Sequence, residues 1–151
     1  MIEEKLASLN ITLPTPPKPA GSYIPVVMVG SLAFVSGQIP IKEGRLEFQG
    51  KVPVQVSLED AQLAAKLCIV NVLSQIKKEI GDLDRISKIV RVSGFVNSAE
   101  DFTEQPKVIN AASDLLFQIF GERGRHSRVA VGVASLPLNA PVEIDLIAEV
   151  S

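Results

Sequence analysis

The segment 142–150 alternates between residues that prefer a protein interior and residues that mostly prefer water. The first set is Val142, Ile144, Leu146, Ala148 and Val150, and the second is Glu143, Asp145, Ile147 and Glu149. Successive side chains of a β-strand point to opposite faces, so this pattern predicts a strand with one buried face. The segment 128–135 alternates in the same way, with valines on one face and Arg128, Ala130, Gly132 and Ala134 on the other. Such strands require a sheet that is covered on at least one side.

Two amphipathic helices are predicted to supply that cover. In the segment 58–80, apolar residues recur at helical spacing, Ser57 offers an N-cap, and Gly81 ends the pattern. A second helix is predicted over 106–120, with Pro106 in its first turn and Gly121 at its end. Strands of this kind with two long amphipathic helices predict an α+β domain, in which the helices pack on one face of a mixed or antiparallel sheet.

The remaining segments fit one domain over residues 1–151. Val26–Val29 and Leu32–Val35 flank Gly30-Ser31 and read as a hairpin. Further strands are predicted at 45–48 and 86–96, the latter with Ile86, Lys88, Val90 and Val92 on one face. Residues 1–20 contribute a short helix at 2–9 and a stiff proline-rich connector.

The composition argues against several classes of function. The formal net charge is −2 and the pI is near 5.4, whereas nucleic-acid-binding domains usually carry a basic face. With one histidine and one cysteine, a zinc site has too few preferred ligands, and no phosphate-binding loop motif occurs. We therefore expect no metal, no cofactor and no nucleic-acid partner.

The setting expected for this chain is the cytoplasm. The first residues lack the basic start and apolar core of a signal peptide, and no apolar run approaches the ~18 residues of a membrane span. The single cysteine, Cys68, excludes a disulfide within one chain, and we expect it to pack as a small hydrophobe.

Arg128 is the first candidate for a binding residue. It precedes small residues on its strand face, which would leave space beside the cation for a ligand. Its planar guanidinium can bind a carboxylate through two parallel hydrogen bonds. The alternative is an arginine that keeps a strand edge soluble. The sole histidine, His126, could share that face and act as acid or base, or could be a surface residue in a basic turn with Arg123 and Arg125.

The face of the sheet away from the helices needs cover of its own. The small residues Ala130, Gly132 and Ala134, with Phe34 or Phe95 nearby, suggest that this face is buried by self-association.

Several segments together resemble the Rid (reactive intermediate deaminase) family, also called the YjgF or endoribonuclease L-PSP family. They are Gly21-Ser22-Tyr23, Val35-Ser36-Gly37-Gln38-Ile39-Pro40, the helix at 58–80, Gly94-Phe95-Val96, the Arg128 strand, and Leu136-Pro137 followed by Val142-Glu143-Ile144. The resemblance runs from about Gly21 to Val150 and leaves out the first 20 residues. It implies a chorismate-mutase-like fold, a homotrimer with clefts between subunits, and hydrolysis of enamines or imines such as 2-aminoacrylate to 2-oxo acids and ammonia.

The resemblance also implies roles for particular residues. Arg128 stands nine residues before Pro137, as the family arginine stands before its Leu-Pro proline, and would bind the substrate carboxylate. Tyr23 would line the pocket, and Glu143 would place the attacking water, although Glu143 also reads as a solvent-side residue of an alternating strand. Candidates for the rest of the cleft are Ser36, Gln38, His126 and Asn110.

The chain departs from the family pattern around the arginine and in the segment 97–110, so two other functions stay open. One is a non-catalytic trimer that binds small carboxylates, and the other is the ribonuclease or translation-inhibitor role attached to the family. The low pI and the scarcity of aromatic residues make the ribonuclease role the least favoured of the three functions.

Overall fold

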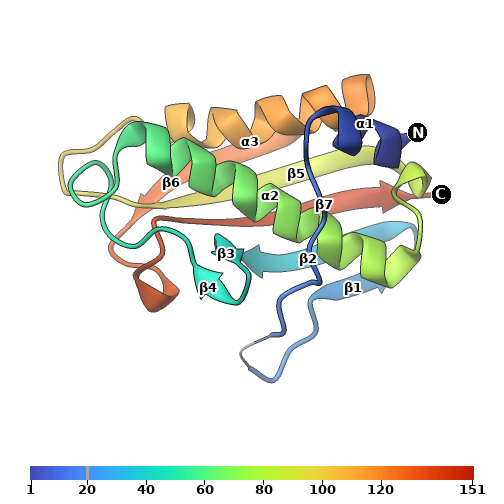
Figure 1. The fold of residues 1–151 in the computed structure, drawn as a ribbon, viewed down its shortest axis with the longest axis horizontal. Helices are drawn as coiled ribbons and strands as arrows, with labels where there is room; N and C mark the ends of the chain where they lie inside the picture. The colour runs from blue at the N-terminus through green and yellow to red at the C-terminus, as the bar shows by residue number, and fades with distance from the viewer. Residues whose placement is uncertain (20) are drawn as a thin grey trace.

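The protein, described here by a computed structural model over residues 1–19 and 21–151, is built on one mixed sheet (Figure 1). The sheet has five strands in the order β1-β2-β7-β5-β6. Their bounds are β1 Val26–Val29, β2 Leu32–Gln38, β5 Ile86–Asn97, β6 Ser127–Val133 and β7 Val142–Val150. The β5–β6 pair is parallel and the other pairs are antiparallel. Arg128 therefore lies on an edge strand of the sheet.

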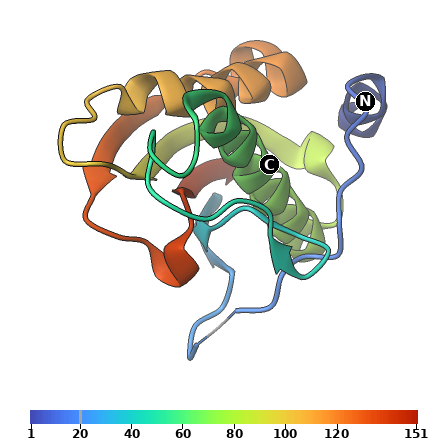
Figure 2. The ribbon, with the colours of Figure 1, turned by 60° about the vertical axis from the view of Figure 1, so that its left-hand side comes forward.

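Two long helices, α2 (Leu58–Ile80) and α3 (Gln105–Phe120), cover one face of this sheet, and the two views agree on this layering (Figures 1 and 2). The predicted bounds are confirmed to within a residue. Ser57 Oγ accepts the backbone N–H of Asp60, and Gly81 and Gly121 end the two helices. The α+β prediction is thus confirmed. Short 3₁₀ turns, η1 (Leu83–Arg85), η2 (Gly121–Gly124) and η3 (Pro137–Asn139), join the elements.

The predicted strand at 45–48 is shorter in the structure. Only β4 (Arg45–Leu46) is formed, and it pairs with β3 (Ile41–Lys42) in a separate two-stranded sheet.

The predicted faces of β5 are wrong in its first half. Ile86, Ile89 and Val92 are all fully buried, whereas Lys88 is exposed and Val90 is half-buried. The pairing with β7 shifts between Ile86 and Lys88 and again between Ile89 and Arg91. Each irregularity adds a residue and reverses the faces that follow it. Strict alternation resumes only from Val92.

We expected the small residues of β6 to lie on the face away from the helices, and this expectation is wrong. Val92 pairs with Arg128 and Gly94 pairs with Ala130, and both β5 residues are buried beneath the helices. Residues directly opposite on neighbouring strands point to the same face, so Arg128 and Ala130 lie on the helix side. The uncovered face instead carries Phe34, Phe95 and Val131, consistent with the aromatic part of the prediction.

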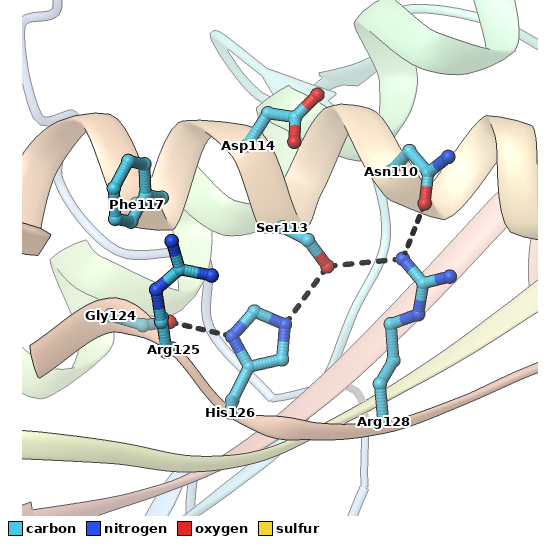
Figure 3. Close-up of a pocket in the computed structure, with 8 residues that line it drawn as sticks. All are labelled: Asn110, Ser113, Asp114, Phe117, Gly124, Arg125, His126 and Arg128. Atoms are coloured by element: carbon cyan, nitrogen blue, oxygen red, sulfur yellow. Dashed lines mark hydrogen bonds between the residues drawn. The ribbon is translucent and has the colours of Figure 1, made fainter. Parts of the chain in front are cut away.

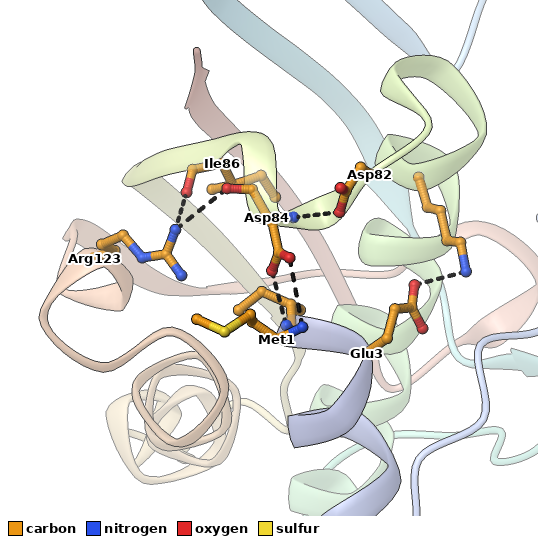
Figure 4. Close-up of polar contacts among 8 residues, drawn as sticks. Met1, Glu3, Asp82, Asp84, Ile86 and Arg123 are labelled. Carbon is orange, nitrogen blue, oxygen red and sulfur yellow. Dashed lines mark hydrogen bonds and ion pairs between the residues drawn. The ribbon is translucent and has the colours of Figure 1, made fainter.

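The N-terminal segment packs against the domain. Helix α1 (Ile2–Ser8) buries Ile2 and Leu6, and the chain then crosses α2, where Gln75 Nε2 donates to Pro17 O at 2.7 Å (Figure 1). The amino group of Met1 lies 3.5 Å from Asp84 Oδ2, and the Ile2 N–H donates to Asp84 Oδ1 at 2.8 Å (Figure 4). These donors and the positive amino terminus lower the pKa of Asp84.

Candidate functional site

Arg128 is held against α3 by two hydrogen bonds from one nitrogen. Nη1 donates to Asn110 Oδ1 at 2.9 Å and to Ser113 Oγ at 3.1 Å (Figure 3). Asn110 and Ser113 are three residues apart, so both lie on the face of α3 that looks onto β6. Because the alternation of β6 turns Arg128 to the helix side, the side chain is half-buried instead of extending into water.

His126 lies beside Arg128 and is bonded at both ring nitrogens. Nδ1 is 2.6 Å from Gly124 O, and Nε2 is 2.9 Å from Ser113 Oγ (Figure 3). A carbonyl can only accept, so Nδ1 carries the proton and the neutral ring accepts the Ser113 hydroxyl at Nε2. Burial lowers the pKa of His126, and the nearby charges of Arg128 and Lys88 lower it further, against the opposing effect of the Gly124 carbonyl.

These residues border an open cavity of about 440 Å³ between α3 and the segment that leads into β6. Asp114, Phe117 and Arg125 complete the lining. Arg125 is tied to Glu122 Oε1 at 3.1 Å, and its guanidinium lies over the Phe117 ring. Two arginines and one carboxylate thus border the cavity, and because Arg125 is paired with Glu122, Arg128 is the cation that could attract a small anion.

Three other predicted residues, Tyr23, Gln38 and Glu143, line a second cavity of about 270 Å³. Its wall is largely apolar and includes Pro17 and Leu138. Burial raises the pKa of Glu143, and the charge of Asp145 raises it further. A half-buried carboxylate of raised pKa is a better proton acceptor than a solvated one.

A bulge in β2 shapes this second cavity. Val35 pairs with Leu146 and Gln38 with Ile144, so one extra residue of β2 is left between the two pairs. Gly37 lies in the bulge, where a Cβ would overlap Glu143 Oε2, so only glycine leaves room for the carboxylate. Ser36 does not line the cavity: its hydroxyl donates to Ile24 O at 3.0 Å and ties the end of β2 to the chain before β1.

The predicted site residues thus form two groups within one chain. Arg128, Asn110 and His126 gather at the first cavity, and Tyr23, Gln38 and Glu143 gather at the second. Glu143 pairs with Phe95 on the uncovered face, whereas Arg128 lies on the helix face. One chain does not bring the two charged groups together.

Sequence reasoning missed polar residues at both cavities, among them Ser113 and Gln75. Ser113 bridges His126 and Arg128, and its only signal in the sequence is its place one helical turn after Asn110. Gln75, in the middle of α2, reaches Gln38 Oε1 at 3.4 Å and carries no signal, because its apolar neighbours dominate the pattern.

Nucleophilic chemistry at the single cysteine finds little support in the structure. Cys68 is fully buried, as expected for a small hydrophobe, and burial raises the pKa of its thiol. Across residues 1–19 and 21–151 no three His, Cys, Asp or Glu side chains group as metal ligands would. Within the same residues no helix is both long and apolar enough to cross a membrane.

A mixed five-stranded sheet with two long helices on one face and an arginine held at its edge defines an α+β protein of the chorismate-mutase-like class. The family model described as "YjgF/chorismate_mutase-like, putative endoribonuclease" matches residues 3–150, so the chain belongs to the YjgF, or Rid, family. The match begins well before Gly21, where the sequence motifs placed its start.

Known relatives cover nearly the whole chain. Protein TCP17 of Trypanosoma cruzi is 41% identical over 151 residues, spanning 99% of this chain and 94% of that protein. The crystal structure of Atu1372 from Agrobacterium tumefaciens has 46% sequence identity and a TM-score of 0.94, covering 99% of this chain and 92% of that one. The 2-iminobutanoate/2-iminopropanoate deaminase of Dermatophagoides farinae is 30% identical over 137 residues, spanning 91% and 92% of the two chains.

Proposed function

We propose that the protein hydrolyses reactive enamines or imines, such as 2-aminoacrylate, to 2-oxo acids and ammonia in a cleft between the subunits of a homotrimer. One observation carries the proposal: Arg128 is fixed by Nη1 alone. Among the described residues no protein group accepts from its Nε or Nη2. That edge offers two parallel N–H donors, which match the two oxygens of a carboxylate.

The chemistry needs positioning more than it needs a strong catalyst. A protonated imine is electrophilic at carbon, and water adds there before the C–N bond breaks and ammonia leaves. Glu143 would accept a proton from that water, and its raised pKa suits the task. Arg128 would hold the carboxylate, and together these groups would fix the geometry that accelerates the attack.

The separation of the two groups within one chain supports a cleft between subunits. Arg128 lies on an edge strand that no other strand of the chain's described residues covers, and Glu143 lies on the opposite face of the sheet. We propose that Arg128 of one subunit meets Glu143 and Tyr23 of its neighbour. The relation to the mite deaminase supports the same reaction class, and the acidic pI speaks against RNA as the partner.

The test is ammonia or pyruvate release from 2-aminoacrylate that is generated in situ. We expect wild type to accelerate release and Arg128→Ala to lose the acceleration. If both proteins fail to accelerate release although Arg128→Ala has the same assembly state as wild type, hydrolysis is refuted.

Binding without turnover is the second candidate, and the separation of Arg128 from Glu143 within one chain favours it. It predicts that pyruvate raises the melting temperature of wild type but not of Arg128→Ala, with no release of ammonia from 2-aminoacrylate.

A further inference from the structure

Ser113 and His126 form a hydrogen-bonded pair that the proposed reaction does not use. The pair lies on the helix side of β6, and it touches Arg128 on the side of the guanidinium that faces α3 (Figure 3). Both side chains are half-buried, so the contacts are shielded from competing water.

The direction of each hydrogen bond can be assigned from the one group that can only accept. Gly124 O takes the proton of His126 Nδ1, so Nε2 presents a lone pair to Ser113. The Ser113 hydroxyl hydrogen points to Nε2, and its oxygen lone pairs are left to accept from Arg128 Nη1. Burial lowers the pKa of His126, so the ring is neutral at pH 7, as this arrangement requires.

The chain of contacts limits how Arg128 can present its charge. Nη1 carries two hydrogens, and Asn110 and Ser113 accept one each. The other two nitrogens point away from His126 in Figure 3. A guanidinium free to rotate would offer either of its forked edges in turn, whereas this one offers a single edge.

We propose that Ser113 and His126 are positioning residues, which act as one unit to orient Arg128 so that its Nε/Nη2 edge is held ready for a carboxylate. This inference rests on the proposed role of Arg128 as the carboxylate anchor. Without His126, the Ser113 hydroxyl could turn toward a carbonyl of its own helix. Without Ser113, the guanidinium would have one fixed hydrogen bond and would rotate about it.

The experiment measures the Kd of pyruvate and, where turnover occurs, KM and kcat for 2-aminoacrylate. We expect Ser113→Ala to weaken pyruvate binding roughly tenfold, the scale of one hydrogen bond to a charged group. KM should rise while kcat stays near wild type, because orientation of the anchor governs binding. Ser113→Thr keeps the hydroxyl and should restore affinity.

Two further variants test whether the pair acts as a unit. His126→Leu should weaken binding about as much as Ser113→Ala, and the double variant should be no weaker than either single variant, since both break the same chain of contacts. Ser127→Ala is the matched control: it removes a neighbouring hydroxyl that donates to Val90 O, away from Arg128, and should leave Kd unchanged.

The outcomes separate this inference from the proposed function. If Arg128→Ala abolishes pyruvate binding but Ser113→Ala has wild-type affinity, the anchor stands and the positioning role is wrong. Additive losses in the double variant also overturn it, since independent contacts would explain them. If Arg128→Ala binds pyruvate as wild type does, the anchor itself fails and the inference fails with it.

Discussion

Arg128 uses its donors in a way that lysine could not copy. An ammonium has three hydrogens, and it cannot serve Asn110, Ser113 and both oxygens of a carboxylate together. We therefore expect Arg128→Lys to raise KM, or the Kd of pyruvate, roughly ten- to hundredfold although the charge is kept. Titration calorimetry with pyruvate measures this.

Arg125→Lys is the control for that change, because Arg125 borders the same cavity but is tied to Glu122 and Phe117. The affinity of Arg125→Lys for pyruvate should stay within about threefold of wild type, because an exposed ion pair contributes little. If Arg128→Lys binds pyruvate as tightly as wild type, the positive charge alone accounts for binding and the paired N–H donors of the guanidinium do not contribute.

Glu143 links stability to pH in a direction that can be worked out. Its pKa is raised in the folded protein, mainly by burial, so the folded state binds the proton more tightly than the unfolded state does. The stabilisation is complete below the ordinary glutamate pKa of about 4.3 and is lost as pH rises through the folded pKa. At neutral pH the buried carboxylate therefore costs stability.

The variant Glu143→Gln should consequently melt at a higher temperature than wild type at pH 7, and the difference should vanish near pH 4. Activity should fall at the same time, since the amide cannot accept the proton from water. Thermal melts across this pH range measure the effect, with Glu149→Gln, on the exposed part of the same strand, as the control. A lower melting point at pH 7 would show that the carboxylate is paired and not penalised.

At the scale of single residues, the predictable part of the site was its charged members. Arg128 stands out in the sequence as a charge on a strand face of small residues, whereas Glu143 fits the alternation of its strand and was singled out by the family resemblance. Ser113 was not predictable, because a serine in an amphipathic helix fits its polar face without any partner. Only the packing of α3 onto β6 brings it between His126 and Arg128.

Among the elements, the helices were predictable and β5 was not. Helix bounds follow from local signals, such as the Ser57 cap and the glycines that end each helix. The faces of β5 depend on two irregularities in its pairing with β7, and pairing between distant segments leaves no local signal. The same limit hid the orientation of β6, because the faces of one strand are fixed by what covers it.

The N-terminal helix contributes to the stability of the whole domain. Leu6 is 1% exposed and packs in the main core, while Glu3 pairs with Lys77 of α2 at 2.6 Å (Figure 4). Leu6→Ala should lower the free energy of unfolding by about 2–5 kcal/mol, the cost of truncating a buried leucine. Urea unfolding measures this, and Glu4→Ala, on the exposed side of α1, should change it by less than about 0.5 kcal/mol.

A Leu6→Ala protein that unfolds at the wild-type urea concentration would mean that α1 detaches before the domain unfolds. The segment at Pro17, which lines the Glu143 cavity, would then be held by its hydrogen bond to Gln75 and by the packing of Leu9, Ile11 and Leu13 against the core, without α1.

At the scale of the whole molecule, the two faces of the sheet differ in how much apolar surface they expose to water. Helices α2 and α3 bury one face, whereas the other exposes apolar side chains, among them Val27 at 43%, Phe34 at 38% and Val131 at 39%. Exposed apolar side chains that gather on one face of a sheet often mark an interface, although this face also carries Arg91, Glu143 and Asp145. The proposed trimer would cover this face and would also bring a second chain to the Arg128 edge.

Phe34→Glu should therefore break the assembly, because it places a charge at the centre of the proposed interface without touching the buried core. Leu63→Glu is the matched control: Leu63 is 52% exposed, but it lies on α2, on the far side of the sheet. Light scattering at micromolar concentration should give a trimer mass for wild type and Leu63→Glu, and a monomer mass for Phe34→Glu. Since Arg128 and Glu143 meet only between chains in this scheme, Phe34→Glu should also lose 2-aminoacrylate hydrolysis while its circular dichroism stays that of the folded chain. A monomeric wild type, or a fully active monomer, would contradict both the assembly and the shared site.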